Sequence, residues 1–193
     1  MKLLKDLADM RTGYPFRERP ERVATGGVQM VQMRDIDGAT GWVRENLEHV
    51  EIPPNWEAHR LHVSDVLLAA RGERNHAAQF VGDHDTVAAS HLTVVRLKAT
   101  EVVIPPYLAW YLNLPQSQER LRALRAGSNI PFIPIEALER IPIHVPSIEM
   151  QNHLVNLQQL SVEEQRLMTQ IQEKRRELMA GVFQCLLTNQ TTA

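Results

Sequence analysis

The sequence predicts a mixed α/β (α+β) domain over residues 1–147, followed by one long coiled-coil-forming helix over residues 148–187. All 11 prolines and eight of the nine glycines lie before Ser147, between short apolar runs typical of mixed strands and helices. After Pro146 there is no proline, and apolar residues recur at steps of three, four and seven, which indicates one face of a continuous helix. At 193 residues and 44% apolar composition, the chain can bury a core without metal or disulfide cross-links.

The first hundred residues contain most of the predicted strands. Residues 3–10 predict a short helix or a strand–helix opening. Residues 28–33 alternate in polarity and lead into an Asp-Gly turn at 35–38, so they predict a strand that ends in a turn. Residues 66–70 are apolar and residues 86–97 are rich in Val and Thr, and each segment is predicted as one strand.

The rest of the domain is predicted to be mainly helical. A Pro-Pro pair at 105–106 starts the first of these helices, because proline suits the first helical turn. The remaining elements, in chain order, are helices at 107–113 and 117–126, a loop at 127–131, a short helix at 135–140 and a strand at 141–145.

The helix predicted over 148–187 carries an apolar stripe. Ser147 can cap its start, and Glu149 lies in the first turn, where the helix dipole favours an acid. Forty residues give a rod of about 60 Å, which cannot bury its own stripe. We therefore expect the rod to pair with a second helix, with folding back onto its own domain as the alternative. The expected dimerisation residues are Leu154, Leu157, Leu160, Leu167, Met168, Ile171, Leu178 and Val182. Residues 188–193 are predicted to be a flexible tail.

Composition and charge limit the classes of function. The one cysteine, Cys185, allows no internal disulfide and fits a reducing cytoplasm, and no apolar run approaches the length of a membrane span. The net charge of −2 leaves room only for a local basic face. Of 21 basic residues, 17 are arginines, whose planar fork matches phosphate or guanine, although high-GC codon usage is the alternative explanation.

Known catalytic and cofactor motifs are missing from the sequence. There is no phosphate-binding loop, no dinucleotide-binding glycine motif and no H-E-x-x-H, and the histidines and the single cysteine form no metal set. Ile104-Pro105-Pro106-Tyr107 approaches the motif of adenine-N6 methyltransferases, which have a polar Asp or Asn where Ile104 stands. We therefore expect no catalytic residues, no metal and no cofactor, and we expect Tyr107, Trp110 and Tyr111 to be core residues.

Several segments follow one another in an order typical of one protein family. They are residues 4–17, 32–38, 63–72, 89–97, 105–112 and 127–128, and then Leu138-Glu139-Arg140-Ile141-Pro142-Ile143-His144-Val145-Pro146-Ser147-Ile148-Glu149-Met150-Gln151. The last segment is similar to a strand, a proline and a glutamine-bearing start of a long helix. Over nearly the whole chain, the segments resemble the specificity subunit of type I restriction–modification systems.

The resemblance implies a half-length member of that family. Such subunits usually carry two target-recognition domains and two long helices that pair antiparallel, and this chain has one of each. The implied activity is sequence-specific recognition of double-stranded DNA, with methyl transfer left to separate DNA methyltransferase (modification) subunits. The expected partners are DNA, those methyltransferase subunits, a second copy of this chain, and a restriction (nuclease/translocase) subunit. The resemblance also implies that Gln151 and the first helical turns face the modification subunits.

The candidate DNA-binding residues lie in loops bordered by proline and glycine. Arginine pairs with guanine and asparagine with adenine in the major groove, whereas ordinary solvated loops and turns are the alternative. Arg120, Arg122 and Arg125 lie on a predicted helix and are expected on a solvated face. The candidates are Arg17, Arg19, Arg22, Arg71, Arg74, Asn75, Ser128 and Asn129.

Two other functions remain open at this point. The chain could be an adaptor that binds protein rather than DNA, dimerising through the same helix. It could also be a degenerate methyltransferase fragment. If it is a DNA reader, a two-fold homodimer predicts a bipartite, palindromic site with an unread gap. Pairing with a different specificity chain is the alternative to the homodimer.

Overall fold

The computed structural model describes residues 1–16, 20–24, 26–54, 56–127 and 129–189, with side chains as far as Leu187. The chain divides into two compact units, Met1–Val155 and Asn156–Ala193. The first unit is mixed α/β, and the described part of the second is helical throughout. The predicted fold class is thereby confirmed.

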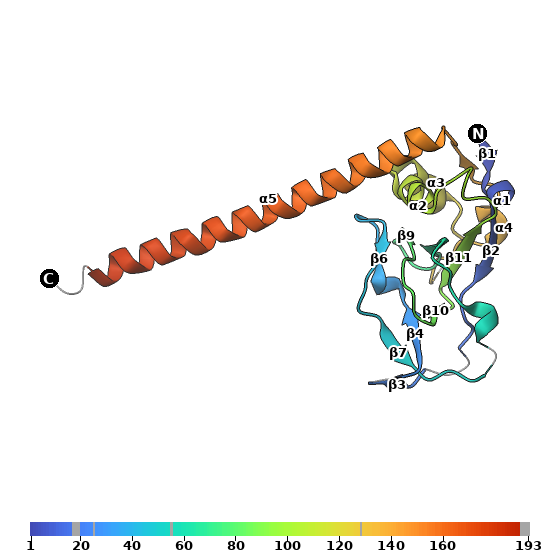
Figure 1. The fold of residues 1–193 in the computed structure, drawn as a ribbon, viewed down its shortest axis with the longest axis horizontal. Helices are drawn as coiled ribbons and strands as arrows, with labels where there is room; N and C mark the ends of the chain where they lie inside the picture. Colours follow the sequence, from blue (N-terminus) through green and yellow to red (C-terminus); the bar gives the residue numbers. More distant parts are fainter. Residues whose placement is uncertain (17–19, 25, 55, 128, 190–193) are drawn as a thin grey trace. The chain divides into compact units, whose positions relative to one another are not determined.

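The first unit is built on a six-stranded sheet in the order β2-β11-β8-β9-β6-β5 (Figure 1). Neighbouring strands run antiparallel, except that β6 and β9 are parallel. The strands are β2 (Ala8–Thr12), β5 (Ile36–Asp37), β6 (Trp42–Val43), β8 (Asp65–Ala69), β9 (Ala77–Gln79) and β11 (Leu92–Leu97).

Strand β8 lies at the centre of the core and is buried on both faces. Val66 and Leu68 pack in one apolar cluster together with Tyr107 of α2 (Pro105–Asn113). Leu67 and Ala69, one residue out of phase, pack in a second cluster on the other face. Burial on both faces explains why β8 has a continuous apolar sequence rather than an alternating one.

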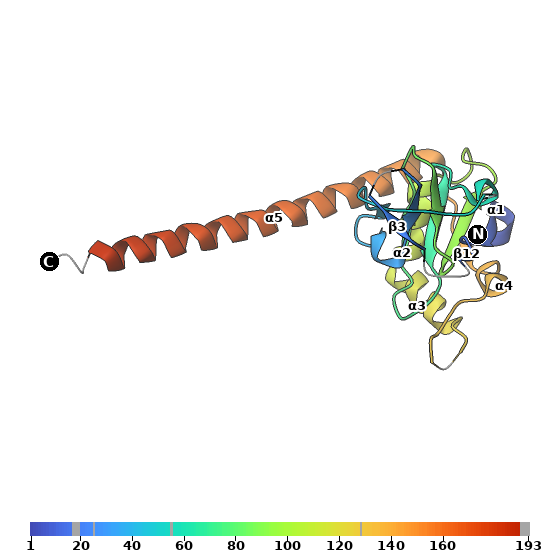
Figure 2. The ribbon, with the colours of Figure 1, turned by 90° about the horizontal axis from the view of Figure 1, so that it is seen from below.

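Two smaller sheets complete the first unit. One has the order β10-β4-β7-β3, and the other pairs the N-terminal β1 with β12 (Figure 2). Their strands are β1 (Lys2–Leu3), β3 (Arg22–Val23), β4 (Val28–Val31), β7 (Glu48–Val50), β10 (Thr86–Ala88) and β12 (Pro142–Ile143).

The prediction of one strand over 86–97 is wrong. The chain turns between β10 and β11, where the N–H of Leu92 donates to the carbonyl of Ala89. Strand β10 then runs parallel to β4 in the four-stranded sheet, whereas β11 lies antiparallel to β2 and β8 in the six-stranded sheet. Val- and Thr-rich composition identified both strands but gave no sign of the turn between them.

The short helices are α1 (Leu4–Leu7), α2, α3 (Pro115–Ala123) and α4 (Ile135–Leu138), with 3₁₀ turns at Met33–Asp35 and Glu57–His59. Prolines occupy the first turns of α2 and α3, as expected for a residue that lacks a backbone donor. Tyr107 is buried and its hydroxyl donates to the carbonyl of His144, and burial raises its pKa to about 12. Tyr107 and Tyr111 are therefore core residues, as predicted, and Trp110 packs partly buried against the same cluster.

Helix α5 (Ile148–Asn189) begins inside the first unit. The Ser147 hydroxyl accepts the Met150 N–H at 3.3 Å, so the predicted cap is confirmed. Gln151 is fully buried: it accepts the Ile104 N–H at 3.0 Å and donates to the carbonyls of Val102 and Pro146, each at 2.9 Å. The expectation that Gln151 faces modification subunits is therefore wrong, because its amide is used within the domain.

One of the predicted dimerisation residues lies in the first two turns of α5. Leu154 packs partly buried against the core of its own domain, next to the buried Val155. Its apolar surface is thus largely covered without a partner helix.

The second unit carries the remaining apolar stripe. In the stretch from Asn156 onward, ion pairs join Glu163 to Arg166 and Lys174 to Glu177, each one turn apart along the helix. The predicted tail falls mainly on residues 190–193, which lie outside the described part of the chain. Among the described helices, none combines the length and apolarity that crossing a membrane requires. The exposed members of the stripe are Leu157, Leu160, Leu167, Met168, Ile171, Leu178 and Val182.

Candidate nucleic-acid interface

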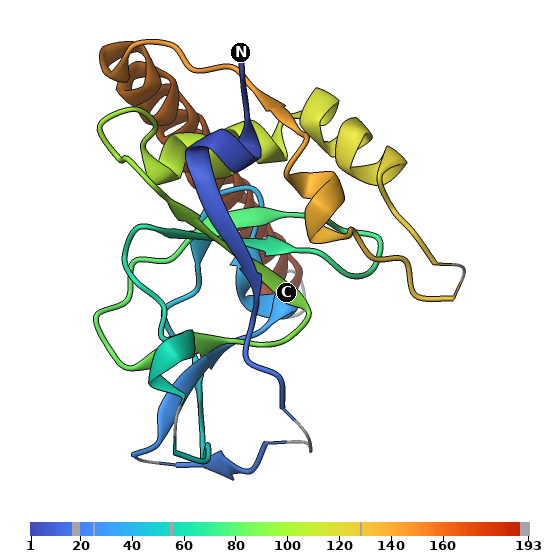
Figure 3. The ribbon, with the colours of Figure 1, turned by 90° about the vertical axis from the view of Figure 1, so that its right-hand side faces the viewer.

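Two loops that are distant in sequence lie side by side on the first unit (Figure 3). The turn after β8 meets the loop after α3, where Arg71 and Phe132 form an antiparallel bridge and the Gly72 N–H donates to the Pro131 carbonyl at 2.8 Å. Asn129, in the second loop, is exposed. Arg71, Arg74 and Asn129 are therefore brought to one region of the surface, and Ser128 lies outside the described residues.

Glycine is required at one position in each of these loops. Gly72 has φ 81° and Gly127 has φ 87°, a left-handed conformation that other residues rarely adopt. At Gly127 a Cβ would also lie 3.3 Å from the carbonyl oxygen of Ile130. Each glycine thus allows a turn conformation that another residue would strain.

Asn75 holds the first loop from inside. Its side chain is 1% exposed, donates to the Ala69 carbonyl at 2.8 Å and accepts from Arg125 Nε at 2.9 Å. The Asn75 backbone carbonyl accepts from Gln118 at 2.8 Å, and the Arg125 guanidinium also donates to the Glu73 carbonyl. This burial argues against the expected contact between Asn75 and a base, because the amide has no face free for a ligand.

Arg125 and Gln118 are positioning residues that the sequence did not reveal. Arg125 was expected on a solvated helix face, but α3 ends at Ala123 and the arginine is partly buried against the loop. Its partner Asn75 is 50 residues away, and Gln118 is 43 residues from the same asparagine. No local pattern could have indicated either contact.

Arg71 and Arg74 are both exposed, and neither forms an ion pair with any residue that the structure describes. Their loop is fixed by its own backbone and by Asn75 rather than by these side chains. Two positive charges are therefore held on a rigid turn and remain available to an anionic or hydrogen-bonding ligand.

A second group of arginines surrounds Glu48. Arg22 on β3 contacts the Glu48 carboxylate at 3.1 Å, Arg34 pairs with the same oxygen, and Gln32 donates to the other oxygen at 2.9 Å. Arg34 also lies 3.8 Å from the Asp35 carboxylate, so the two guanidinium groups face two acidic side chains. Arg17 and Arg19 lie outside the described residues.

Two hollows connect these groups. One, of about 290 Å³, is lined by residues that include Arg71 and Phe132, and the other, of about 330 Å³, is lined by residues that include Arg22 and Glu48. Ser90 and His91 line both hollows, so the surface is continuous. We call this surface the arginine face, defined by the lining residues Arg22, Arg71, His91 and Phe132 together with Arg34, which pairs with Glu48, and Arg74, which follows in the Arg71 turn.

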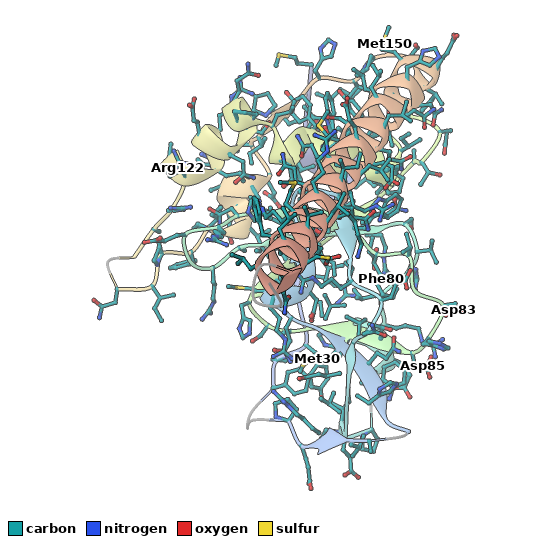
Figure 4. The ribbon with its side chains drawn as sticks, turned by 90° about the vertical axis from the view of Figure 1, so that its left-hand side faces the viewer. Met30, Phe80, Asp83, Asp85, Arg122 and Met150 are labelled. Carbon is teal, nitrogen blue, oxygen red and sulfur yellow. The ribbon has the colours of Figure 1, made fainter. Side chains whose placement is uncertain are left out.

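Acidic residues gather elsewhere on the domain. Asp83 and Asp85 are exposed in the β9–β10 loop, on the side of the domain opposite the loop at 127–132 (Figure 4). Asp85 pairs with Arg60, so this region is not uniformly acidic. Glu73 and Glu136 are exposed near the arginine face and moderate its charge.

Other arginines are structural. Arg96 makes two contacts of 2.7 Å with the fully buried carboxylate of Asp65, and this hydrogen bonding raises the pKa of Arg96. Arg11 donates to the carbonyls of His59 and Arg60, and burial, followed by repulsion from Arg96, lowers its pKa. Part of the arginine excess therefore serves the fold rather than a ligand.

These features define a class of protein: a mixed α/β domain with a rigid, arginine-bearing face, followed by an extended helix with an uncovered apolar stripe. No protein-family model matches the chain, and no curated protein matches its sequence. Solved structures, however, share its fold.

The S subunit of a type I restriction–modification system from M. genitalium matches with a TM-score of 0.59 at 16% identity, over 87% of this chain and 39% of that chain. The HsdS subunit from Thermoanaerobacter tengcongensis matches with a TM-score of 0.58 at 15% identity, over 85% and 37%. A chain from a structure of complex assembly in the type I R-M system gives 0.64 at 14% identity, over 90% and 40%. The chain thus has the fold of type I restriction–modification specificity subunits and spans about two-fifths of their length.

Proposed function

We propose that this chain is a half-length specificity subunit that reads the sequence of double-stranded DNA for a type I restriction–modification methyltransferase. The observation that carries the proposal is the pair of unpaired arginines, Arg71 and Arg74, held on a rigid turn in a domain with the specificity-subunit fold. In this role the chain performs no catalysis, and methyl transfer is the task of separate modification subunits. A restriction subunit is a further proposed partner.

The chemistry of the arginine face fits DNA. An arginine can donate two hydrogen bonds to O6 and N7 of guanine, and each such pair contributes about 1–3 kcal/mol of discrimination. Arg22 lines the second hollow and Arg34 pairs with Glu48 in its wall, and both are suited to phosphate contacts, which position a protein without reading sequence. Because the backbone of the loop of Arg71 and Arg74 is already fixed by Asn75, little backbone conformational entropy is lost on binding.

A selection from random DNA duplexes tests this reading. We expect the full chain to enrich one motif, and Arg71→Ala or Arg74→Ala to relax one base position of it. Arg22→Ala should weaken all sequences alike and reduce the slope of log affinity against log salt by about one. Arg122→Ala, on the exposed face of α3, is the matched control and should leave the motif unchanged.

Two results would count against the proposal. If Arg71→Ala and Arg74→Ala select the same motif as the folded wild type, the arginine face is not the DNA surface. If the wild type enriches no motif, sequence reading itself is rejected and the protein-binding adaptor becomes the better explanation.

We further propose that a second copy of the chain covers the stripe of α5. Two copies together approach the length of one specificity subunit, since each spans about two-fifths of it. The part of α5 from Asn156 to its end is about 50 Å long and exposes seven of the eight predicted dimerisation residues. Antiparallel pairing of two such helices would place the domains at opposite ends of the pair and give a palindromic, gapped site.

Sedimentation velocity at micromolar concentration tests the dimer. Ile171→Asp places a charge in the stripe and should produce a monomer, whereas Gln172→Asp, one residue along the same helix and off the stripe, should remain a dimer. A wild-type monomer without partner subunits would reject the homodimer and leave pairing with a different specificity chain.

A further inference from the structure

The arginine face also presents apolar side chains. Phe132 is 43% exposed, Ile130 is 67% exposed and Met33 is 37% exposed. Phe132 and Ile130 belong to the loop that pairs with the Arg71 turn, and a Cβ at Gly72 would lie 3.8 Å from the terminal methyl group of Met33. A surface that bound only phosphate would use charge and hydrogen-bond donors, whereas these apolar groups fit a ligand that also carries an apolar group.

Phe132 is the most firmly placed of the three. Its backbone exchanges both hydrogen bonds with Ala126, at 2.8 and 2.9 Å, and forms a bridge with Arg71. Its ring lies against Gly127, where a Cβ would be 3.6 Å from the nearest ring carbon. The exposed part of the ring is therefore presented in a fixed position, in the hollow that Arg71 and His91 also line.

We propose that Phe132 reads thymine through its 5-methyl group, at a base pair next to the one contacted by Arg71. The inference rests on the proposed DNA-reading function. In the major groove, the edges of the bases carry hydrogen-bond donors and acceptors, and the thymine methyl is the apolar group among them. An aromatic ring and an arginine that line one hollow of about 290 Å³ match a thymine methyl beside a guanine.

The packing of Phe132 favours this contact over insertion between bases. Side chains that act as wedges stand free of their own domain and enter the base stack. More than half of the Phe132 surface is already covered by its own loop, so the ring offers one exposed side rather than a projecting wedge.

The experiment compares two random-core duplex libraries, one amplified with dTTP and one with dUTP, selected on the full chain. Uracil lacks only the methyl group of thymine. We expect the wild type to bind the best thymine-containing site about fourfold more tightly than the same site with uracil. This factor corresponds to the free energy of about 0.8 kcal/mol that burial of one methyl-sized group contributes. Phe132→Ala should bind the two sites equally, and Phe132→Leu, which keeps an apolar group, should retain a preference.

The controls separate folding from reading. Val81→Ala removes apolar surface from a side chain that is 44% exposed and lies outside the arginine face, and it should keep the thymine preference. If Phe132→Ala unfolds at a lower temperature than the wild type, Phe132→Gln provides a variant of similar length without the apolar surface and should also lose the preference.

The outcomes distinguish this inference from the function on which it rests. A wild type that enriches the same motif with equal affinity from both libraries overturns methyl reading but leaves sequence-specific DNA binding intact. Thymine preference that survives in both Phe132→Ala and Phe132→Gln shows that another residue reads the methyl group and overturns the assignment of Phe132. A wild type that enriches nothing from either library overturns the proposed function, and the inference with it.

Discussion

Replacing Gln151 with alanine should destabilise the first unit strongly, although the residue lies on a helix that is otherwise exposed beyond Val155. The change removes three hydrogen bonds and leaves the Ile104 N–H and the carbonyls of Val102 and Pro146 without this partner. A buried polar group without a partner costs about 1–3 kcal/mol, and the three groups share one site that water can partly refill. We therefore expect a loss of about 2–4 kcal/mol in the free energy of unfolding, or roughly 5–15 °C in Tm for a unit of this size.

Urea and thermal unfolding, followed by circular dichroism, measure this loss. His153→Ala is the matched control, because His153 is exposed two residues further along the same helix and should change stability by less than about 0.5 kcal/mol. Gln151→Glu should also destabilise near neutral pH, since a carboxylate can accept from Ile104 but cannot donate to two carbonyls. Its folded-state pKa should then exceed the unfolded value, so its stability should recover as the pH falls. Equal unfolding of Gln151→Ala and His153→Ala would refute the reasoning.

Three further predictions concern the same unit. A chain truncated after residue 155 should still fold cooperatively. A chain truncated after residue 147 lacks Gln151 and the buried Val155, so it should unfold at a lower temperature in a thermal scan. Gly127→Ala should lower the free energy of unfolding by about 1–3 kcal/mol, as measured in urea, because Gly127 has a positive φ. Gly181→Ala is the control, since Gly181 lies in open space on α5, and this change should stabilise the helix by about 0.5–1 kcal/mol. Equal effects of the two changes would contradict backbone strain at position 127. Burial raises the pKa of Asp35. The folded state therefore binds a proton at this carboxyl more readily than the unfolded chain does. As a result, the contribution of Asp35 to stability falls as the pH rises through the raised pKa. Asp35→Asn can still accept the Gln32 N–H but carries no charge at any pH. We therefore expect the difference in stability between Asp35→Asn and the wild type to be more favourable to the variant at pH 7 than at pH 4. Urea unfolding at both pH values measures this difference.

The sequence predicted the fold class because its signals are local and strong. Eleven prolines before Ser147 and none after it separate a mixed domain from a continuous helix, and the strand at β8 is apolar along its whole length. The split between β10 and β11 could not be predicted, because the Ala89–Leu92 turn contains neither proline nor glycine. The two strands join different sheets through partners that are distant in sequence.

The candidate site was predictable as a set of loops but not as a set of contacts. Arg71 and Arg74 are exposed near Gly72, as their sequence context suggested. Asn75 has the same local context, yet it is buried, because Gln118 on α3 and Arg125 just after α3 approach it from more than 40 residues away. Residue type and spacing identify which loops are polar, whereas tertiary packing decides which side chain turns inward.

The inward-facing Asn75 has a consequence for how such a protein can change its target. The hydrogen bonds that shape the reading loop come from Asn75, Gln118 and Arg125, and none of them involves the side chains of Arg71 or Arg74. Substitution of exposed, unpartnered side chains usually changes stability by less than about 0.5 kcal/mol. In the proposed DNA reader, the two arginine positions can therefore vary while the scaffold stays the same, so new DNA targets would arise, by mutation or by design, without a new fold.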